Sequence, residues 1–244
     1  MADLVYMTKA TWTAITDAFR NKLGSTEMIK AGDIPSALNS LQKYVDMISG
    51  DITSVSDENA TSVRSSCFYY CGKLQEVYLP NVTFIGLSAF AGCDMLSKIN
   101  IQNVETLDDS ALAGCCRIIE LYLPKAITIG NSACNRMTAL KKVTIGNIKT
   151  IEAYAFDGNI NCEEIDISLN ENVDSIGAYA FFNNKLSKLI IRGTALIPLA
   201  SSNALVGTLI ADGTGKIYVD PSMVDTYKTA TNWSTYASVI EAIP

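Results

Sequence analysis

The chain has 244 residues, of which 48% are apolar and 18% charged, so it has the composition of packed domains rather than of a disordered chain. Its formal net charge of −6 argues against nucleic acid and anionic membranes as partners, because both require a basic surface. The sequence contains no histidine, which excludes imidazole-dependent catalytic triads and zinc-hydrolase sites, and we expect no cofactor and no metal.

Residues 1–50 are predicted to form an N-terminal helical module. Apolar residues fall on one helical face over 11–23 and again over 34–48, where Pro35 suits the first turn of a helix. Two short amphipathic helices bury little surface alone, so we expect them to pack on the first repeat, to dock on another chain or to self-associate. The polar residues 51–61 are interpreted as a connector.

Residues 62–193 divide into six repeats that agree at six columns, which step by 22 residues until a longer step precedes the last repeat. Each repeat contains an L-x-x-L-x-L pattern, whose alternation predicts a strand with one buried face. A column of small residues runs beside a column of mostly aromatic ones. The column at the second leucine position of the pattern reads Val77, Ile99, Leu121, Val143, Ile165 and Leu189.

This period is typical of leucine-rich repeats, in which each row rests on its neighbours and all rows share one core. We therefore predict a leucine-rich-repeat solenoid: a right-handed β/α superhelix with parallel strands on its concave face and short turns or 3-10 segments on its convex face. Asparagine follows the strands at Asn81, Asn103 and Asn147, where such repeats use its amide for unpaired backbone groups. Lys125 interrupts that column.

One column of charged residues alternates in sign from row to row: Glu76, Lys98, Glu120, Lys142, Glu164 and Lys188. Stacked strands place these side chains about 4.8 Å apart, where opposite charges attract and like charges repel. We predict a structural ladder of salt bridges that helps to fix the strand register, with unpaired, solvated charges as the alternative. Substituting Glu120 with lysine is then expected to cost more stability than substituting an isolated surface glutamate.

The concave face is predicted to be the recognition surface. Its outward column reads Tyr78, Asn100, Tyr122, Thr144, Asp166 and Ile190, with Gln75, Ser97, Ile119, Lys141, Glu163 and Ser187 beside it. Two strand spacings place Tyr78 and Tyr122 about 10 Å apart with Asn100 between them, and aromatic rings around a polar centre suit a sugar or a peptide. The candidate ligand-binding residues are Tyr78, Asn100, Tyr122, Thr144 and Asp166; an ordinary hydrated sheet surface is the alternative.

The other reactive side chains have simpler interpretations. The seven cysteines are odd in number, so we expect no disulfide framework, and the recurrence of Cys71, Cys93 and Cys115 is interpreted as packing rather than as a metal or redox site. The acidic run of Glu163, Glu164 and Asp166 is interpreted as a solvated strand edge rather than a calcium site. We find no nucleophile with a base in a recognisable motif, so no catalytic residue is predicted.

Residues 194–244 are predicted to form a C-terminal α/β cap. The segment 202–205 resembles a remnant of the repeat turn, 217–219 is predicted to be a short strand, and a helix is expected after Asp220-Pro221-Ser222. The apolar pattern continues through Trp233, Tyr236 and Ile240. A cap is required because the open end of a solenoid would expose its core and its strand edge.

The rows, as in Val82 to Ile101, resemble the BspA-like leucine-rich repeat family of bacteria, and 217–240 resembles that family's C-terminal cap, so the resemblance covers 62–243. Cys134, where an aromatic residue is usual, and the longer row near 168–172 depart from the pattern. Residues 13–22 and 34–38 are similar to a small module at the head of phage and prophage structural proteins. The repeat resemblance implies extracellular adhesion or partner binding.

We therefore expect a non-enzymatic module that recognises a protein or surface glycan through its concave face, as a phage or prophage tail-associated protein. The alternative is a structural spacer that docks through residues 1–50. No run of about 18 apolar residues suggests membrane insertion, and the start of the chain lacks the pattern of a secretory signal. We expect synthesis in a bacterial cytoplasm followed by virion association or release, with the cell surface as the alternative location.

Overall fold

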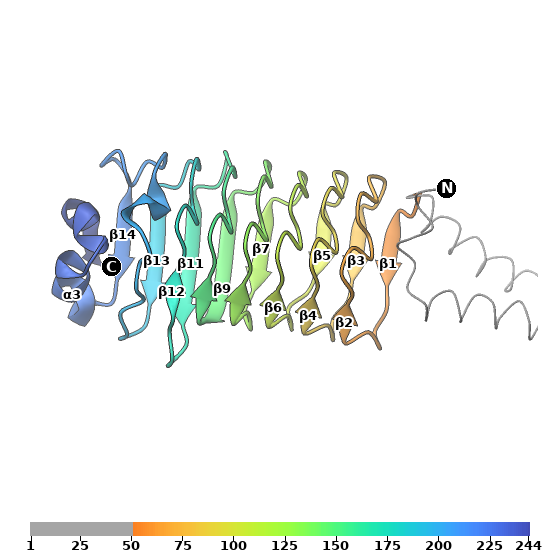
Figure 1. Ribbon diagram of the computed structural model, residues 1–244, viewed down its shortest axis with the longest axis horizontal. Coiled ribbons are helices and arrows are strands. Elements are labelled where there is room, and N and C mark those ends of the chain that lie inside the picture. Colours follow the sequence, from red (N-terminus) through yellow and green to blue (C-terminus); the bar gives the residue numbers. More distant parts are fainter. Residues whose placement is uncertain (1–50) are drawn as a thin grey trace, which may run out of the picture. The chain divides into compact units, whose positions relative to one another are not determined.

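The computed structural model describes residues 51–244, and Thr53–Pro244 form one compact unit. The predicted N-terminal helical module, residues 1–50, lies outside the described residues. Within the unit, the chain winds into a stack of rows whose strands run side by side (Figure 1). This confirms the predicted leucine-rich-repeat solenoid. No helix among residues 51–244 combines the length and the hydropathy that crossing a membrane requires.

Each repeat contributes one longer and one two-residue strand. The longer strands are β3 (Glu76–Tyr78), β5 (Lys98–Asn100), β7 (Glu120–Leu123), β9 (Lys142–Ile148), β11 (Glu164–Leu169) and β13 (Lys188–Arg192). The two-residue strands are β2 (Ser62–Val63), β4 (Phe84–Ile85), β6 (Thr106–Leu107), β8 (Thr128–Ile129), β10 (Thr150–Ile151) and β12 (Ser175–Ile176). All pair in parallel, and the two-residue strands form one continuous sheet, which we call the short-strand sheet.

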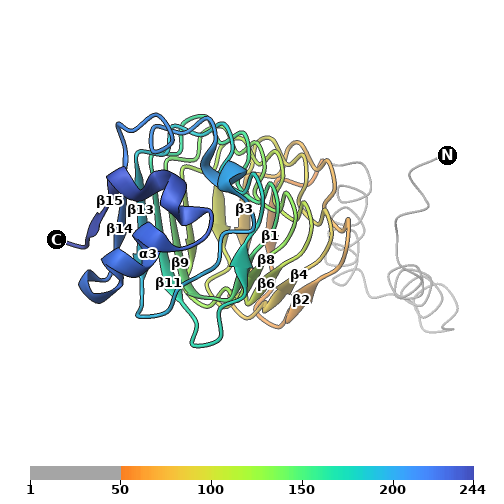
Figure 2. The ribbon, with the colours of Figure 1, turned by 60° about the vertical axis from the view of Figure 1, so that its left-hand side comes forward.

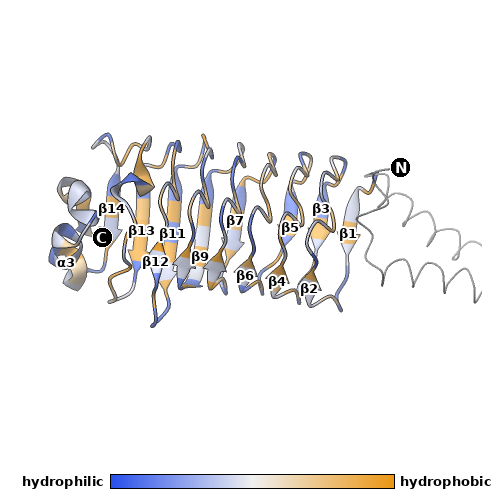
Figure 3. Cartoon of the chain, viewed as in Figure 1, coloured by the Kyte–Doolittle hydropathy of each residue, from blue (hydrophilic) through white to orange (hydrophobic). Residues whose placement is uncertain are grey.

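The core lies between the longer strands and the turns that face them. Residues at alternate positions of the strands are buried, which gives the banded hydropathy of Figure 3. The aromatic column stacks in two pairs of rows, with ring centroids 5.1 Å apart for Phe68 and Phe90 and 6.0 Å apart for Phe156 and Phe181. Leu112 and Cys134 occupy the two rows between these pairs. The neighbouring small column is fully buried at Ala89, Ala111, Ala133, Ala155 and Ala180. Small side chains here let each turn lie against the next.

The longer strands do not form one sheet. They divide into a sheet of order β1-β3-β5 and a sheet of order β15-β14-β13-β11-β9-β7, and among residues 51–244 no ladder joins β5 to β7. Val77 aligns with Ile99, and Leu121 aligns with Val143, as the repeat predicts. The expected alignment of Ile99 with Leu121 on paired strands is therefore wrong, although the short-strand sheet continues across this point from Ile85 to Leu107. We call the interruption between β5 and β7 the seam.

Strands beyond the six repeats extend the sheets at both ends. The segment 51–61, interpreted from the sequence as a connector, contains β1 (Ser54–Ser56), which pairs in parallel with β3. At the other end β14 (Lys216–Val219) pairs with β13, and β15 (Ile240–Ala242) pairs with β14. The 3-10 segment η2 (Ser202–Leu205) occupies the place of a repeat turn, because the Phe181 amide donates to the Ala204 carbonyl at 2.9 Å.

Helical segments cover the end of the stack, beyond β14 (Figure 2). They are η3 (Pro221–Met223), α3 (Val224–Thr229) and η4 (Trp233–Val239). The indole N–H of Trp233 donates to the carbonyl of Ile197 at 2.8 Å, and the hydroxyl of Tyr227 lies 3.2 Å from the carbonyl of Ala195. These side chains bond backbone groups that a further row would otherwise have paired, which explains how the cap ends the solenoid.

Candidate functional site

The outward side chains of the longer strands form the strand face, which is the face predicted to be concave. Tyr78 and Tyr122 are 44% and 56% exposed there, and Ile119, immediately before β7, is 55% exposed. Asn100 and Thr144 are half-buried. Tyr78 lies in register with Asn100, and Tyr122 lies in register with Thr144. The seam separates the first pair from the second, so the four residues belong to two sheets rather than to consecutive strands of one.

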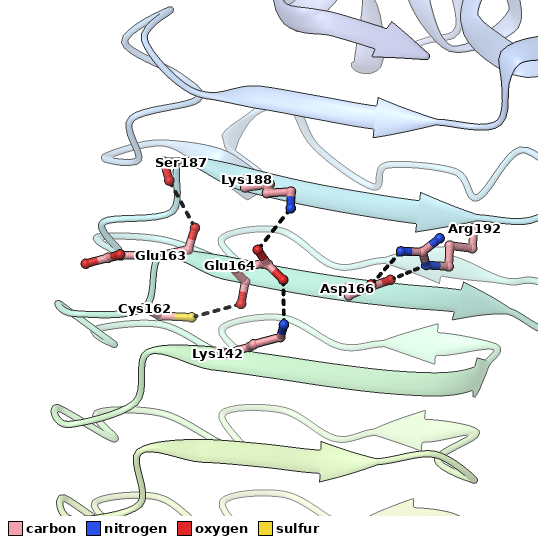
Figure 4. Close-up of polar contacts among 8 residues, drawn as sticks. All are labelled: Lys142, Cys162, Glu163, Glu164, Asp166, Ser187, Lys188 and Arg192. Carbon is pink, nitrogen blue, oxygen red and sulfur yellow. Dashed lines mark hydrogen bonds and ion pairs between the residues drawn. The ribbon is translucent and has the colours of Figure 1, made fainter. Parts of the chain in front are cut away.

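Asp166, another candidate ligand-binding residue, already has a partner. Its two carboxylate oxygens accept hydrogen bonds from Nε and Nη2 of Arg192 at 2.8 and 2.9 Å, a bidentate ion pair (Figure 4). The sequence reasoning missed Arg192, because it lies two positions further along its strand than the residue in register with Asp166. That residue, Ile190, was placed among the outward side chains but is only 5% exposed, in register with Asp166 and Tyr218 on its two sides.

The charged column forms ion pairs over two separate stretches. In the first, Lys98 Nζ lies 2.6 Å from Glu76 Oε1. In the second, Glu164 receives Lys142 at 2.9 Å on Oε1 and Lys188 at 3.1 Å on Oε2 (Figure 4). Each carboxylate oxygen of Glu164 thus has its own lysine, and the three rows of β9, β11 and β13 are tied together on the strand face.

The predicted continuous ladder is wrong at Glu120, which forms no ion pair with any of the residues 51–244. The reason is geometric. Glu120 lies on β7 and Lys98 lies on β5, and these two strands are not paired because the seam separates them. Lys98 forms its ion pair with Glu76 on β3 instead. On the other side Lys142 turns to Glu164. Glu164, rather than Glu120, is therefore the carboxylate that pairs with a lysine on each side.

Replacing Glu164 with glutamine is expected to lower the free energy of unfolding by about 0.5–1 kcal/mol, because exposed ion pairs contribute little and two are lost together. The pKa of Glu164 is lowered, first by the hydrogen bond from Lys142 and then by that from Lys188. This contribution is therefore complete above the unfolded pKa of about 4.5 and is lost as the pH falls through the lower folded pKa. Urea unfolding at pH 7 and pH 3 measures both effects.

Glu120→Gln is the matched control, since it removes a carboxylate from the same column without breaking an ion pair among the described residues. It is expected to change the unfolding free energy by less than Glu164→Gln does. Equal losses for the two variants at pH 7, or a Glu164→Gln deficit that persists unchanged at pH 3, would contradict the assignment of the network to Glu164.

Three cysteines that recur at one position of the repeats are packing residues. Cys71, Cys93 and Cys115 are buried, and the thiols of Cys93 and Cys115 donate to the carbonyls of Phe68 and Phe90 at 3.1 and 3.3 Å. Burial raises the pKa of Cys71 to about 11 and that of Cys93 to about 12, which disfavours the reactive thiolate at neutral pH.

The acidic run on β11 also lacks the arrangement of a metal site. Its members diverge: Glu164 pairs with two lysines and Asp166 with Arg192, whereas the backbone of Glu163 accepts from the hydroxyl of Ser187 (Figure 4). Within residues 51–244, no group of three or more cysteine, aspartate or glutamate side chains is placed to hold a metal ion. The charged side chains of β9, β11 and β13 on this face pair with one another.

A family model for the BspA type leucine rich repeat region, present in six copies, matches residues 41–163 and 128–197, which is more than half of the chain. Comparison with curated proteins gives no match.

Three solved structures are similar to this chain. A leucine-rich repeat protein of T. pallidum is 21% identical over 51% of this chain and 73% of its own, with a TM-score of 0.41. One from Bacteroides ovatus is 16% identical over 66% of this chain and 59% of its own, with a TM-score of 0.37. The pneumococcal vaccine antigen PcpA is 14% identical over 78% and 77%, with a TM-score of 0.28.

The family match agrees with the stacked rows, the parallel strands and the buried aromatic and alanine columns of the structure. The chain belongs to the BspA-type leucine-rich-repeat family.

Proposed function

We propose that this protein is a non-enzymatic binding module that recognises a protein or a glycan through the strand face near Tyr78 and Tyr122. Repeats of this type commonly mediate protein binding or adhesion. One observation carries the choice of surface: two tyrosines, with Ile119 beside the second, are about half exposed, the first on β3, which pairs on both edges, and the second on β7, which pairs with β9. Aromatic side chains on an ordered frame contribute large contact area at low entropic cost.

Charge and pairing support the same part of the strand face. From β9 to β13 the charged side chains of the strands pair with one another through Glu164 and Asp166, so a ligand that contacts them would have to break ion pairs. Tyr78, Asn100 and Tyr122 take no part in these ion pairs, and their hydroxyl and amide groups can form hydrogen bonds to a ligand. On the same strands lie the Glu76–Lys98 ion pair and Glu120, which forms no ion pair among the described residues. A saccharide or a peptide segment without acidic groups therefore suits this surface better than an anionic partner.

The experiment is a screen of the full chain on a glycan array and a peptide array, followed by titration of the strongest hit. A Tyr78→Ala/Tyr122→Ala variant is expected to lose at least about tenfold in affinity, because buried aromatic contacts dominate such interfaces. Tyr154→Ala is the matched control, since Tyr154 is 40% exposed but lies on the turn side, stacked on Tyr179. Unchanged affinity in the double variant, or an equal loss in the control, would move the site away from the strand face.

We propose a phage- or prophage-associated setting for this activity, supported by the similarity of residues 13–22 and 34–38 to a module of phage structural proteins. In that setting the repeats present the strand face to a bacterial surface. Docking or self-association through residues 1–50 stays a prediction, as does the location of the protein after synthesis.

A further inference from the structure

The backbone at the seam lacks hydrogen bonds that every neighbouring pair of rows forms. The amide of Ser97 donates to Gln75 at 3.0 Å, and that of Lys141 donates to Ile119 at 2.8 Å. The equivalent amide of Ile119 makes no bond to Ser97, although both residues belong to the described part of the chain. Each seam strand therefore presents an unpaired edge in the middle of the solenoid.

A second bond is missing at the other end of the same strands. The amide of Leu79 donates to the carbonyl of Asn100 at 3.1 Å. One row further on, the amide of Ile101 makes no such bond to Tyr122 within residues 51–244. The seam thus extends along the full length of β5 and β7 rather than affecting one irregular residue.

The core is also less covered at the seam. In the apolar column that crosses it, Ile99 is half-buried, whereas the other five members are buried: Val77, Leu121, Val143, Ile165 and Leu189. The loss of the Lys98–Glu120 ion pair at the same place removes a third kind of contact between these rows. Backbone bonds, apolar cover and charge pairing therefore fail together.

The opposite side of the same two rows remains closed. The amide of Gly92 donates to Ala113 at 2.8 Å, and that of Thr106 donates to Thr83 at 3.1 Å. The short-strand sheet continues from β4 to β6. The two rows are therefore joined along the turns and the short-strand sheet and separated only on the strand face, which is the geometry of a hinge.

A side-chain contact that joins the rows before the seam is also absent at the seam. After β3, the side-chain amide of Asn81 donates to the carbonyl of Glu58 in the preceding row at 2.7 Å, and after β5 that of Asn103 donates to Pro80 at 2.6 Å. These two side chains fasten the ends of neighbouring strands to each other. After β7 the same position is Lys125, whose longer and flexible side chain forms no hydrogen bond to Gln102 within residues 51–244. Among the described residues the later rows, with Asn147, Leu169 and Gly193 at this position, also lack the contact, but there the strand ladders from β7 to β13 join the rows. At the seam both the side-chain contact and the strand ladder are absent.

We propose that the seam is a hinge, kept open by Lys125, about which the rows up to β5 and the rows from β7 onwards separate on the strand face while the turns stay bonded. Opening there costs few contacts, so it requires less free energy than opening any other pair of rows. Tyr78 and Tyr122 lie on opposite sides of the hinge, so its motion changes their spacing. The hinge itself does not depend on the proposed function and is tested without a ligand.

Hydrogen exchange of the unmodified full chain gives the first test. Amide exchange at Ile101 and Ile119 is expected to be at least about tenfold faster than at Leu79 and Lys141, the bonded residues at the same positions of the neighbouring rows. Exchange at the seam that is as slow as in those rows would overturn the proposal.

Labelling of an introduced thiol tests whether the core itself opens. In a Cys67→Ser/Cys116→Ser chain, where the other cysteines are buried, Leu121→Cys and Val143→Cys place a thiol at 2% and 0% exposed positions of one column. Labelling at Leu121→Cys is expected to be at least about tenfold faster than at Val143→Cys after correction for each variant's rate of global unfolding. Equal corrected rates would overturn the hinge.

The variant Lys125→Asn tests the cause. It is expected to slow exchange at Ile119 and labelling at Leu121→Cys toward the values of the bonded rows, because it places a short side-chain amide opposite the Gln102 carbonyl, as Asn81 and Asn103 do in the preceding rows. Lys185→Asn, which removes an exposed lysine from another row, is the control and is expected to leave both rates unchanged. A Lys125→Asn chain that exchanges as fast as the unmodified one would overturn the proposal that Lys125 keeps the hinge open.

Discussion

Replacing Trp233 with alanine is expected to lower the free energy of unfolding by about 3–5 kcal/mol, the largest effect of any single substitution considered for this chain. The indole is fully buried, stacks edge-on against Tyr227 with centroids 5.1 Å apart, and donates to the carbonyl of Ile197. Its removal leaves a cavity beneath the cap and a buried carbonyl without a partner. Both defects lie at the end of the solenoid, where no further row can compensate.

Trp233→Phe separates the two contributions, because phenylalanine fills most of the space but cannot donate to Ile197. It is expected to cost about 1–2 kcal/mol, mainly for the carbonyl left unpaired. Urea unfolding followed by circular dichroism measures both variants, since the loss of the tryptophan would alter a fluorescence signal directly. A loss below about 1 kcal/mol for Trp233→Ala would show that the cap does not unfold together with the repeats.

The register of the repeats could be predicted from the sequence because it depends on columns. Ile165 is buried by its own row and by the residues in register with it on the neighbouring strands. An apolar residue that recurs with the period of the repeat therefore indicates a contact that recurs with the same period. The buried alanine and aromatic columns follow for the same reason. Every contact that repeats with the period leaves a trace in the sequence.

The candidate site was harder to predict because it depends on contacts that do not repeat. Asp166 reaches Arg192, which lies outside the column of its neighbours, and Glu164 takes both adjacent lysines while Glu120 takes none. The alternating charges of the column show which ion pairs could form between neighbouring rows, but not which of them do form. Lys125 replaces asparagine in the row after the seam, but Leu169 and Gly193 replace it in later rows whose strands pair. The sequence column therefore did not mark the position of the seam.

Gly177→Ala is expected to cost about 1–3 kcal/mol, because an added methyl group would overpack two rows of backbone. A Cβ at this position would lie 2.4 Å from the Ala153 nitrogen and 2.5 Å from the Glu152 carbonyl carbon. Neither atom belongs to a flexible side chain, and the amide of Gly177 is bonded to Ile151 at 2.7 Å, so the rows cannot separate without losing that bond. The control is Gly72→Ala, whose Cβ would meet only the Tyr70 oxygen at 3.9 Å.

Glycine returns at this column in every second row, at Gly86, Gly130 and Gly177, while a charged residue occupies the rows between. At Gly86 and Gly130 a Cβ would likewise come within 2.7 and 2.8 Å of the preceding row's backbone. The alternation is therefore a condition for close stacking, and Gly177→Ala should lower the urea midpoint while Gly72→Ala stays within about 0.5 kcal/mol of the unmodified chain. Equal midpoints for the two variants would show that the rows can move apart at this column without loss.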